Sequence, residues 1–151
     1  MGLLNSGIDI CASGLTAQRL RMDVIANNLA NSTTTRTENG GPYRRQIVIF
    51  EARSNKNDFK QLLEREITGL SGVRVKEITN DNSPLRQVYE PSHPDANPDG
   101  YVSYPNVNVV AEMTDLISAS RSYDANVTAL NSIKRMATAA LLRETLAAAQ
   151  N

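Results

Sequence analysis

The chain has no tryptophan, a single cysteine and a single histidine, and only 5% of its 151 residues are aromatic. The lone Cys11 excludes an internal disulfide and any zinc site built from several cysteines, and we interpret it as a small buried apolar residue. With so few large side chains, a thick globular core is not expected. Narrow apolar stripes between helices need only Ala, Leu, Val and Ile, so this composition favours helix pairs.

Excess charge and long apolar runs are missing as well. Sixteen basic and 16 acidic residues balance, which argues against a dedicated nucleic-acid binder. No apolar run approaches the roughly 20 residues that span a bilayer. The first residues, MGLLNSGIDICASGL, lack a basic region followed by a long apolar core, so a cleaved secretory signal is not expected there.

What the sequence does contain is a long apolar repeat at each end. Near the N-terminus the steps alternate between four and three residues, as in a heptad pattern, with one polar interruption. The positions are Leu4, Ile8, Cys11, Leu15, Gln18, Met22, Ile25 and Leu29. A helix of about 26 residues is about 39 Å long at about 1.5 Å per residue, and a stripe of that length needs a packing partner.

The C-terminal repeat is longer and broader. Its positions are Val109, Met113, Leu116, Ser120, Tyr123, Val127, Leu130, Lys134, Ala137 and Leu141. Ile117 and Ile133 widen the apolar face, which predicts more than one packing partner. Asn108 is placed to cap the start of this helix, and Glu112 lies in its first turn, where the helix dipole favours an acid.

The fold class that follows is mainly α with a small β element. Long N- and C-terminal helices are expected to pair as an antiparallel, coiled-coil-like hairpin, with a short-stranded β region and a proline-rich loop between them. Residues 1–32 and 109–151 would form one helical core domain, and residues 33–108 the loop and small β region. An ordinary helical bundle is the alternative, but the middle of the chain offers no convincing further helix, only a short helical stretch near residues 58–67.

Three segments of the middle region are predicted to be strands of one small sheet. QIVIFEA (residues 46–52) is rich in β-branched residues, GVRVKEITND (72–81) alternates apolar and polar residues, and PLRQVYEP (84–91) is short and extended. The following segment, SHPDANPDGYVSYPNVN, contains too many prolines for a helix and is predicted to be a long loop with a turn at Asp99-Gly100.

No catalytic, cofactor-binding or metal-binding motif is found, and none of these sites is expected. His93 lies near Asp95 and Asp99, but one histidine beside hard oxygen ligands defines no metal geometry, and no nucleophile accompanies it. We interpret His93 as a turn residue. Tyr43 and Arg44 are interpreted as protein contacts. Tyr101 and Tyr104 are candidates for an interface anchor or, equally, for loop packing.

Three asparagines, Asn27, Asn28 and Asn31, lie at the end of the first helical repeat, although Asn is a poor residue inside a helix. One explanation is that the amides make contacts to neighbouring subunits, because a polar residue in a packing surface specifies register. Replacing Asn28 with Leu would then leave the monomer folded and impair assembly. The other explanation is helix termination, since Asn31 and the following STTT are good turn residues.

At this point a family resemblance can be stated. SGLTAQRLRMDVIANNLANSTT (residues 13–34) resembles the N-terminal signature of bacterial flagellar axial proteins, which comprise the rod, hook and hook-associated proteins. GGPYRRQIVIFEA (40–52) and the stretch from VYEPSHPDANPDGYVSYPNVN to SIKRM (88–136) are similar to the proximal-rod proteins of the basal body. The likeness covers nearly the whole chain apart from about residues 53–71 and the last few.

The resemblance implies a non-enzymatic structural subunit without cofactor, whose terminal helices assemble into the hollow rod that carries motor torque to hook and filament. It implies other rod subunits and basal-body proteins as partners, and export across the inner membrane by the flagellar type III apparatus without a cleaved signal. It does not imply nucleic acid, a small-molecule substrate or membrane insertion. A helical adaptor or export chaperone, and an enzyme using His93, are the alternative classes.

The residues expected at the assembly interface follow from the helical repeats and the motifs. On the N-terminal helix they are Leu4, Ile8, Cys11, Leu15, Met22, Ile25, Asn27, Asn28, Leu29 and Asn31. On the C-terminal helix they are Val109, Met113, Leu116, Ile117, Tyr123, Val127, Leu130, Ile133 and Leu141. Loop contacts are expected from Tyr43, Arg44, Tyr101, Tyr104, Asn106 and Asn108.

Overall fold

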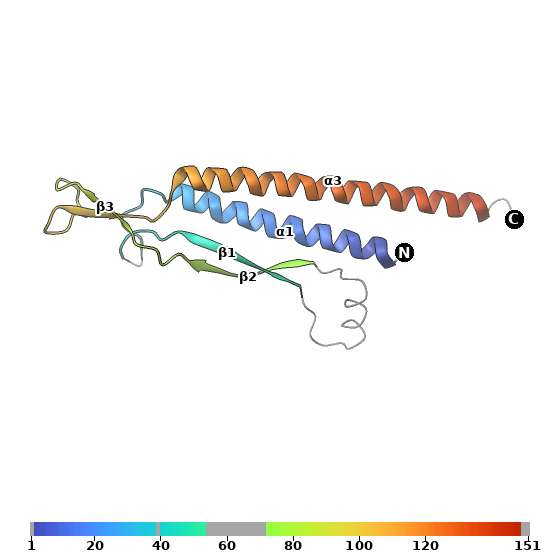
Figure 1. Cartoon of the computed structure of the whole chain (residues 1–151), viewed down its shortest axis with the longest axis horizontal. Coiled ribbons are helices and arrows are strands. Elements are labelled where there is room, and N and C mark those ends of the chain that lie inside the picture. The colour runs from blue at the N-terminus through green and yellow to red at the C-terminus, as the bar shows by residue number, and fades with distance from the viewer. Residues whose placement is uncertain (1, 39, 54–71, 149–151) are drawn as a thin grey trace. The chain divides into compact units, whose positions relative to one another are not determined.

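The computed structural model describes residues 2–38, 40–53 and 72–148, with side chains from residue 6 to residue 143 of these ranges. The described residues form two long helices and four strands, and the strands lie between the helices in the order of the sequence (Figure 1). The helices are α1 (Gly2–Ala30) and α3 (Val109–Ala148), and the strands are β1 (Gln46–Ala52), β2 (Val73–Asn80), β3 (Arg86–Tyr89) and β4 (Tyr101–Tyr104). The predicted mainly α class with a small β element is confirmed. The helical stretch expected near residues 58–67 lies outside the described residues.

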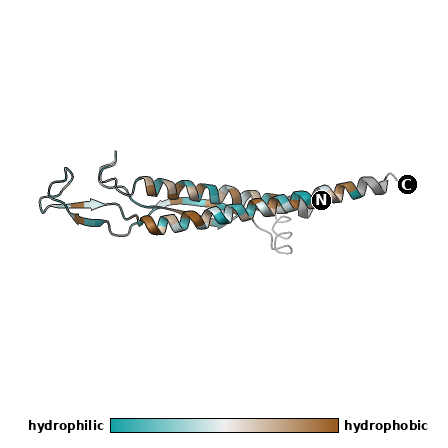
Figure 2. Cartoon of the chain, turned by 90° about the horizontal axis from the view of Figure 1, so that it is seen from above, coloured by the Kyte–Doolittle hydropathy of each residue, from teal (hydrophilic) through white to brown (hydrophobic). Residues whose placement is uncertain are grey.

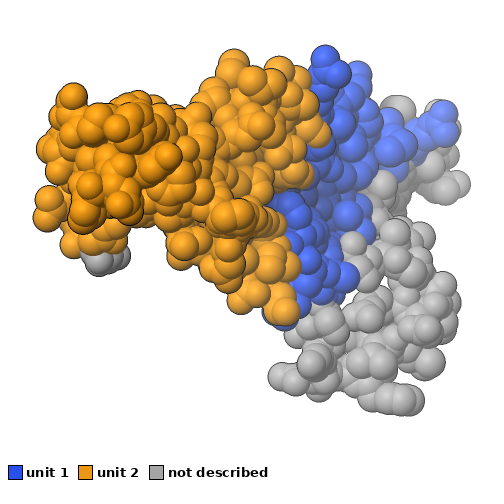
Figure 3. Space-filling view, turned by 60° about the vertical axis from the view of Figure 1, so that its left-hand side comes forward, with its two compact units in different colours: residues 1–19, 50–75, 121–151 blue, residues 20–49, 76–120 orange. Residues whose placement is uncertain are grey.

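Figure 2 shows apolar residues recurring along both helices and alternating with polar ones. The chain divides into two compact units, and each contains parts of both helices (Figure 3). The first consists of residues 1–19, 50–75 and 121–151, and the second of residues 20–49 and 76–120. No helix in the described part of the chain has the length and apolarity of a membrane span.

The strands form two separate pairs, β1 with β2 and β3 with β4, so the prediction of one three-stranded sheet was wrong. The partner of β3 is β4, a segment that was expected to be loop. Arg86 lies opposite Tyr104 and Tyr89 opposite Tyr101 in an antiparallel register. The prolines around β4 precluded a helix but left these four residues free to form a strand, and Val102 at its centre is fully buried.

The predicted turn at Asp99-Gly100 closes the β3–β4 hairpin. The side-chain oxygen of Asn97 accepts hydrogen bonds from the backbone amides of Asp99 (3.1 Å) and Tyr101 (2.8 Å), which fixes the turn. Gly100 has a φ of +80°, a conformation that residues with a Cβ rarely adopt. A Cβ at Gly100 would also lie 2.8 Å from Cε2 of Tyr89, so both the backbone and the space require glycine.

Asparagine side chains cap the start of α3 and the end of α1. Asn108 accepts hydrogen bonds from the amides of Val110 (3.1 Å) and Ala111 (3.2 Å), which confirms it as the N-cap of α3. At the end of α1, the amide side chain of Asn31 donates to the backbone oxygen of Asn27 at 3.0 Å and to its side-chain oxygen at 2.9 Å. Helix termination therefore explains Asn31.

In the first unit the two helices approach closely at glycines of α1. A Cβ added to Gly14 would lie 3.0 Å from Nδ2 of Asn126, and one added to Gly7 would lie 3.2 Å from Cδ1 of Ile133. The hydroxyl of Ser13 accepts a hydrogen bond from the backbone amide of Val73 at 3.1 Å, which ties α1 to the start of β2. Small side chains on α1 thus set how near its neighbours can pack.

We expect Gly100→Ala to destabilise the protein more than Gly41→Ala, because both glycines have positive φ but only Gly100 is crowded. The backbone effect alone costs about 1 kcal/mol, and the contact with the Tyr89 ring adds to it at position 100. Urea unfolding of the two variants and the parent chain measures the difference. Equal losses would show that the contact with the ring is unimportant.

Candidate functional site

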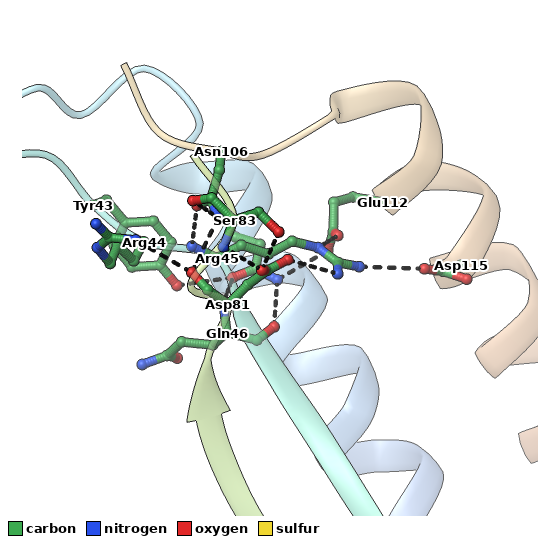
Figure 4. A network of polar contacts seen from close by, with 10 residues as sticks. Tyr43, Arg44, Arg45, Gln46, Asp81, Ser83, Asn106, Glu112 and Asp115 are labelled. Atoms are coloured by element: carbon green, nitrogen blue, oxygen red, sulfur yellow. Dashed lines mark hydrogen bonds and ion pairs between the residues drawn. The ribbon is translucent and has the colours of Figure 1, made fainter. Parts of the chain in front are cut away.

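The most highly connected site in the second unit is a network of polar side chains, which we call the polar clamp. Its members are Asn28, Tyr43, Arg45, Asp81, Asn106 and Glu112 (Figure 4). They come from the end of α1, the segment before β1, the residue after β2, the loop after β4 and the first turn of α3. Segments that are far apart in the sequence therefore meet at one point.

Asn28 is 1% exposed, and every hydrogen-bonding position of its side chain is used. Its Nδ2 donates to the backbone oxygen of Gln46 (2.9 Å) and to Oε2 of Glu112 (3.0 Å). Its Oδ1 accepts from the hydroxyl of Tyr43 and from the backbone amide of Gln46, both at 2.9 Å. An amide side chain has two donor hydrogens and two acceptor lone pairs, so no capacity remains for another molecule.

This arrangement corrects the expectation that Asn28 contacts a neighbouring subunit. The side chain is enclosed by its own chain, and a leucine in its place would leave the Gln46 amide and the Glu112 carboxylate without their partner. Asn28→Leu, which was expected to leave the monomer folded, is therefore now expected to destabilise it. The side chain of Asn27 is exposed: it accepts the bond from Asn31 and donates one long bond, from Nδ2 to Oε1 of Gln46 at 3.4 Å, so it remains a candidate for contacts to neighbours.

Glu112 is a carboxylate that is 1% exposed. An unpaired buried carboxylate is strongly unfavourable, so its partners are essential. Besides Asn28, its Oε1 accepts a 2.6 Å hydrogen bond from Nε of Arg45. Its place in the first turn of α3 adds the favourable field of a helix N-terminus.

Arg45 stands at the centre of the acidic groups. Its guanidinium lies 3.7 Å from carboxylate oxygens of Asp81 and of Asp115, in addition to the bond with Glu112. Burial acts to lower the pKa of Arg45, but the hydrogen bond and the negative charges outweigh it, so the pKa is raised. The backbone amide of Arg45 donates to Oδ1 of Asn106 at 2.9 Å, which fixes the segment that carries the guanidinium.

Asp81 and Tyr43 show how the network shifts ionisation. The side chain and backbone of Ser83 donate to Asp81, and with Arg45 they lower the pKa of its carboxyl group. Burial, and then the charge of Glu112, raise the pKa of the Tyr43 hydroxyl. Tyr43 therefore stays protonated and able to donate to Asn28.

The apolar residues expected at the interface on α1 are buried or half-buried wherever their side chains are described. Cys11 and Ile25 are buried, and Ile8, Leu15, Met22 and Leu29 are half-buried. The side chain of Leu4 lies outside the described residues. The buried Ala17 and Val24 were missed, because the strict heptad pattern skips the neighbouring positions of a broader helix face.

On α3 the most buried residues are Glu112 and Ala119, neither of which was expected at an interface. Leu116, Tyr123, Val127, Leu130 and Ile133 are half-buried, whereas Val109, Met113, Ile117 and Leu141 are exposed. The inward positions at 112, 119, 126 and 133 are one residue before the predicted 113, 120, 127 and 134. Of these four, Ile133 was expected, whereas Glu112 and Asn126 could not be found by a pattern of apolar residues because they are polar.

The expected loop contacts are made within the chain. Tyr43 and Asn106 belong to the clamp, Asn108 caps α3, and Arg44 donates a long hydrogen bond to the backbone oxygen of Asp81. The two hairpin tyrosines hold the β3–β4 pair: Tyr101 packs edge-on against Tyr89, and Tyr104 donates to Glu90 and lies under the Arg86 guanidinium. Burial, then the bond with Glu90, raises the pKa of Tyr104.

His93 has a structural contact in the turn after β3. Its Nδ1 accepts a hydrogen bond from the backbone amide of Asp95 at 3.1 Å, and the Asp95 carboxylate accepts one from the hydroxyl of Thr35 at 2.8 Å. Within the described ranges, no group of three or more His, Cys, Asp or Glu residues is arranged to hold a metal ion.

Comparison with known proteins gives consistent matches along the chain. Residues 8–36 match the family model described as "Flagella basal body rod protein", and residues 99–143 match "Flagellar basal body rod FlgEFG protein C-terminal". The chain is 51% identical to the flagellar basal-body rod protein FlgC of Borreliella burgdorferi, over 93% of this chain and 97% of the relative. It is 46% identical to the FlgC protein of Bacillus subtilis, over 89% and 93%.

A third FlgC protein, from Salmonella typhimurium, is 42% identical over 90% of this chain and 93% of its own length. The class is therefore that of the flagellar basal-body rod proteins. Within this class the chain belongs to the FlgC family, and it is a structural subunit of the rod. The two matched regions contain Asn28 and Glu112, so the clamp joins the two ends by which the family is recognised.

We expect Asn28→Ala to lower the free energy of unfolding by about 2–4 kcal/mol, because it removes four hydrogen bonds and leaves buried partners unsatisfied. The matched control is Asn27→Ala on the same helix turn, for which a change of about 0.5 kcal/mol is expected. Urea unfolding followed by circular dichroism measures both. Similar small losses for the two variants would contradict the central role of Asn28.

The pH dependence of the clamp follows from Asp81. Its lowered pKa means that the ionised form stabilises the fold above the unfolded pKa of about 3.9, and that this contribution is lost as the pH falls through the lower folded pKa. Asp81→Asn should therefore reduce stability at pH 7, and the difference from the parent should shrink below about pH 4. Asp99→Asn, in an exposed loop, is the control. A difference that is constant with pH would contradict this assignment.

Proposed function

We propose that the subunit builds the rod through its terminal helices, which pair antiparallel as a coiled-coil-like hairpin. The contacts within each unit support this pairing. In the second unit Asn28 meets Glu112 and Arg21 meets Asp115, and in the first unit Gly14 approaches Asn126 and Gly7 approaches Ile133. As the residue number falls along α1, the number of its partner on α3 rises, which is the order expected for antiparallel neighbours.

The exposed apolar face of α3 is the observation that carries the assembly role. Its inward positions are already occupied by contacts with α1, yet Val110, Met113 and Ile117 remain exposed. Exposed apolar patches on a soluble protein mark contacts with other molecules. A subunit surrounded by neighbours needs apolar surface on several sides of its helices, and this helix has it.

Many such contacts, repeated around a hollow tube, would allow the rod to transmit torque from the motor to the hook and filament. Burial and dispersion add over all subunits, so no single contact has to carry the load. The partners are other rod subunits and neighbouring basal-body proteins. A helical adaptor that caps one partner would form a finite complex, whereas this function requires open assembly.

We also propose that the subunit reaches its place by the flagellar type III export apparatus, without removal of a signal. This route would leave α1 whole, so that its last turn can hold Asn28 in the clamp. Residues 1–32 and 109–151 would act together as the helical core of the assembled subunit, and residues 33–108 as its loop and small β region.

Ile117→Glu tests the assembly role. The position is exposed, so the unfolding free energy should change by no more than about 0.5 kcal/mol. Placing a carboxylate in an apolar contact should weaken association at least tenfold, equivalent to about 1.4 kcal/mol per contact. The measurement is the amount of tagged subunit in purified basal bodies of a strain that lacks its own copy, together with swimming.

The control for this variant is Thr128→Glu, which adds the same charge at an exposed position of α3 away from the apolar residues. We expect the control to assemble normally. If both variants assemble as well as the parent chain, the exposed face of α3 is not an assembly surface. If the parent chain forms a discrete complex with one partner and is not incorporated into basal bodies, the alternative function of a helical adaptor is favoured.

A further inference from the structure

One face of α3 is exposed from residue 110 to residue 135. Its positions recur every three or four residues, so they lie on the same side of the helix. The first part of this face has large apolar side chains, with exposed fractions of 54% for Met113 and 55% for Ile117, and the rest is polar or charged. We call this face the α3 stripe, and its residues are Val110, Met113, Ile117, Arg121, Asp124, Thr128, Asn131 and Arg135.

A second exposed face, on α1, has only small or charged side chains. Its positions also recur every three or four residues. Gly7, Gly14 and Asn28, which approach α3 of the same chain, lie on the opposite side of α1. This face is therefore turned away from its own α3 and is free to meet another helix. We call it the α1 stripe, and its residues are Asp9, Ala12, Thr16, Arg19, Asp23, Ala26 and Ala30.

The two stripes are complementary in charge when the helices run antiparallel. In that direction the facing positions have residue numbers that add up to 143 or 144, and three pairs of opposite charge result: Asp23 with Arg121, Arg19 with Asp124, and Asp9 with Arg135. Within the described ranges, none of these six side chains belongs to an ion pair, so their charges are available to a partner. Complementary charges across an interface select the partner surface and fix the register.

The same register places large side chains opposite small ones. Short side chains allow two helices to approach closely and leave room for longer ones on the facing helix. Thr128 lies opposite Thr16 and beside Arg19, so a carboxylate added at position 128 would meet no like charge. At the apolar part of the α3 stripe the facing pairs are Met113 with Ala30 and Ile117 with Ala26.

We propose that the α3 stripe of one copy of this chain docks antiparallel on the α1 stripe of a second copy. Helices of the two kinds then alternate from copy to copy, and all copies point in the same direction. Each contact leaves one α1 stripe and one α3 stripe free for further copies. The inference rests on the proposed rod function and adds to it the surfaces by which successive copies join.

The register also predicts how each copy is displaced from the last. Within one chain the facing residue numbers add up to 140, as they do for Asn28 with Glu112 and for Gly14 with Asn126. The contact between copies adds three or four residues, a displacement of about 5 Å along the helices at about 1.5 Å per residue. Contacts between unlike surfaces that do not close on themselves generate an open helix.

Charge reversal tests the contact. Asp23→Arg and Arg121→Asp are made separately in a strain that lacks its own copy, and the tagged subunit in purified basal bodies is measured. Each variant brings like charges together between copies, so we expect its incorporation to fall about tenfold. Both positions are exposed, so the urea midpoint of the purified chain should not change. The control is Arg143→Asp, exposed on α3 beyond the last position that faces the α1 stripe, and it should be incorporated like the parent chain.

Co-expression of the two variants with different tags identifies the second copy as the partner. Every contact between unlike chains then joins opposite charges, so incorporation should return to within about threefold of the parent level, with both tags in equal amounts. Incorporation of either variant alone at the parent level would overturn the proposal, and so would failure of the mixture to recover. If either reversal lowers the urea midpoint, Arg19→Asp with Asp124→Arg provides the same test at the next pair.

The parent chain separates this result from the proposed function. If the parent chain is recovered in basal bodies while the mixture of variants is not, the rod function stands and a second copy is the wrong partner for these stripes. Absence of the parent chain from basal bodies would instead remove the proposed function, and with it the inference that rests on it.

Discussion

The fold depends on one buried carboxylate. Glu112 lies in the first turn of α3, away from water, and an uncompensated charge in that place would be costly enough to separate the helix from its neighbours. Asn28 supplies a donor from the end of α1 and Arg45 supplies one from the segment before β1. The requirement to satisfy Glu112 therefore specifies where three parts of the chain must lie.

A buried polar network of this kind gives specificity more than stability. Apolar contacts between α1 and α3 tolerate sliding, because one leucine packs almost as well as the next. Asn28 has four directed hydrogen bonds: a shift of α1 by one turn would break all of them, and a shift of α3 would break the one to Glu112. These bonds therefore fix where the end of α1 lies relative to Gln46 and to the first turn of α3.

Local features of the structure could be read from the sequence. The Asn108 cap, β1 at residues 46–52 and the turn at Gly100 follow from short-range chemistry, and all three are present. The residues of the clamp could not be assembled in the same way, since Asn28 and Glu112 are brought together by tertiary structure. An apolar template also favoured Met113 over Glu112, because it assumes that the inward side of a helix is apolar. In this helix one of the two buried positions is charged, and the neighbouring methionine is exposed.

The bond between Asn28 and Glu112 spans 84 positions of the sequence. An extended chain of that length reaches on the order of 280 Å. If the polypeptide passes through a narrow channel with its N-terminus first, Asn28 therefore emerges long before Glu112. Until then the amide has only nearby groups to bond, and closing so large a loop is slow compared with local folding. The clamp can therefore form only late. The end of α1 acquires its final surroundings after residue 112, and with it most of the chain, has emerged.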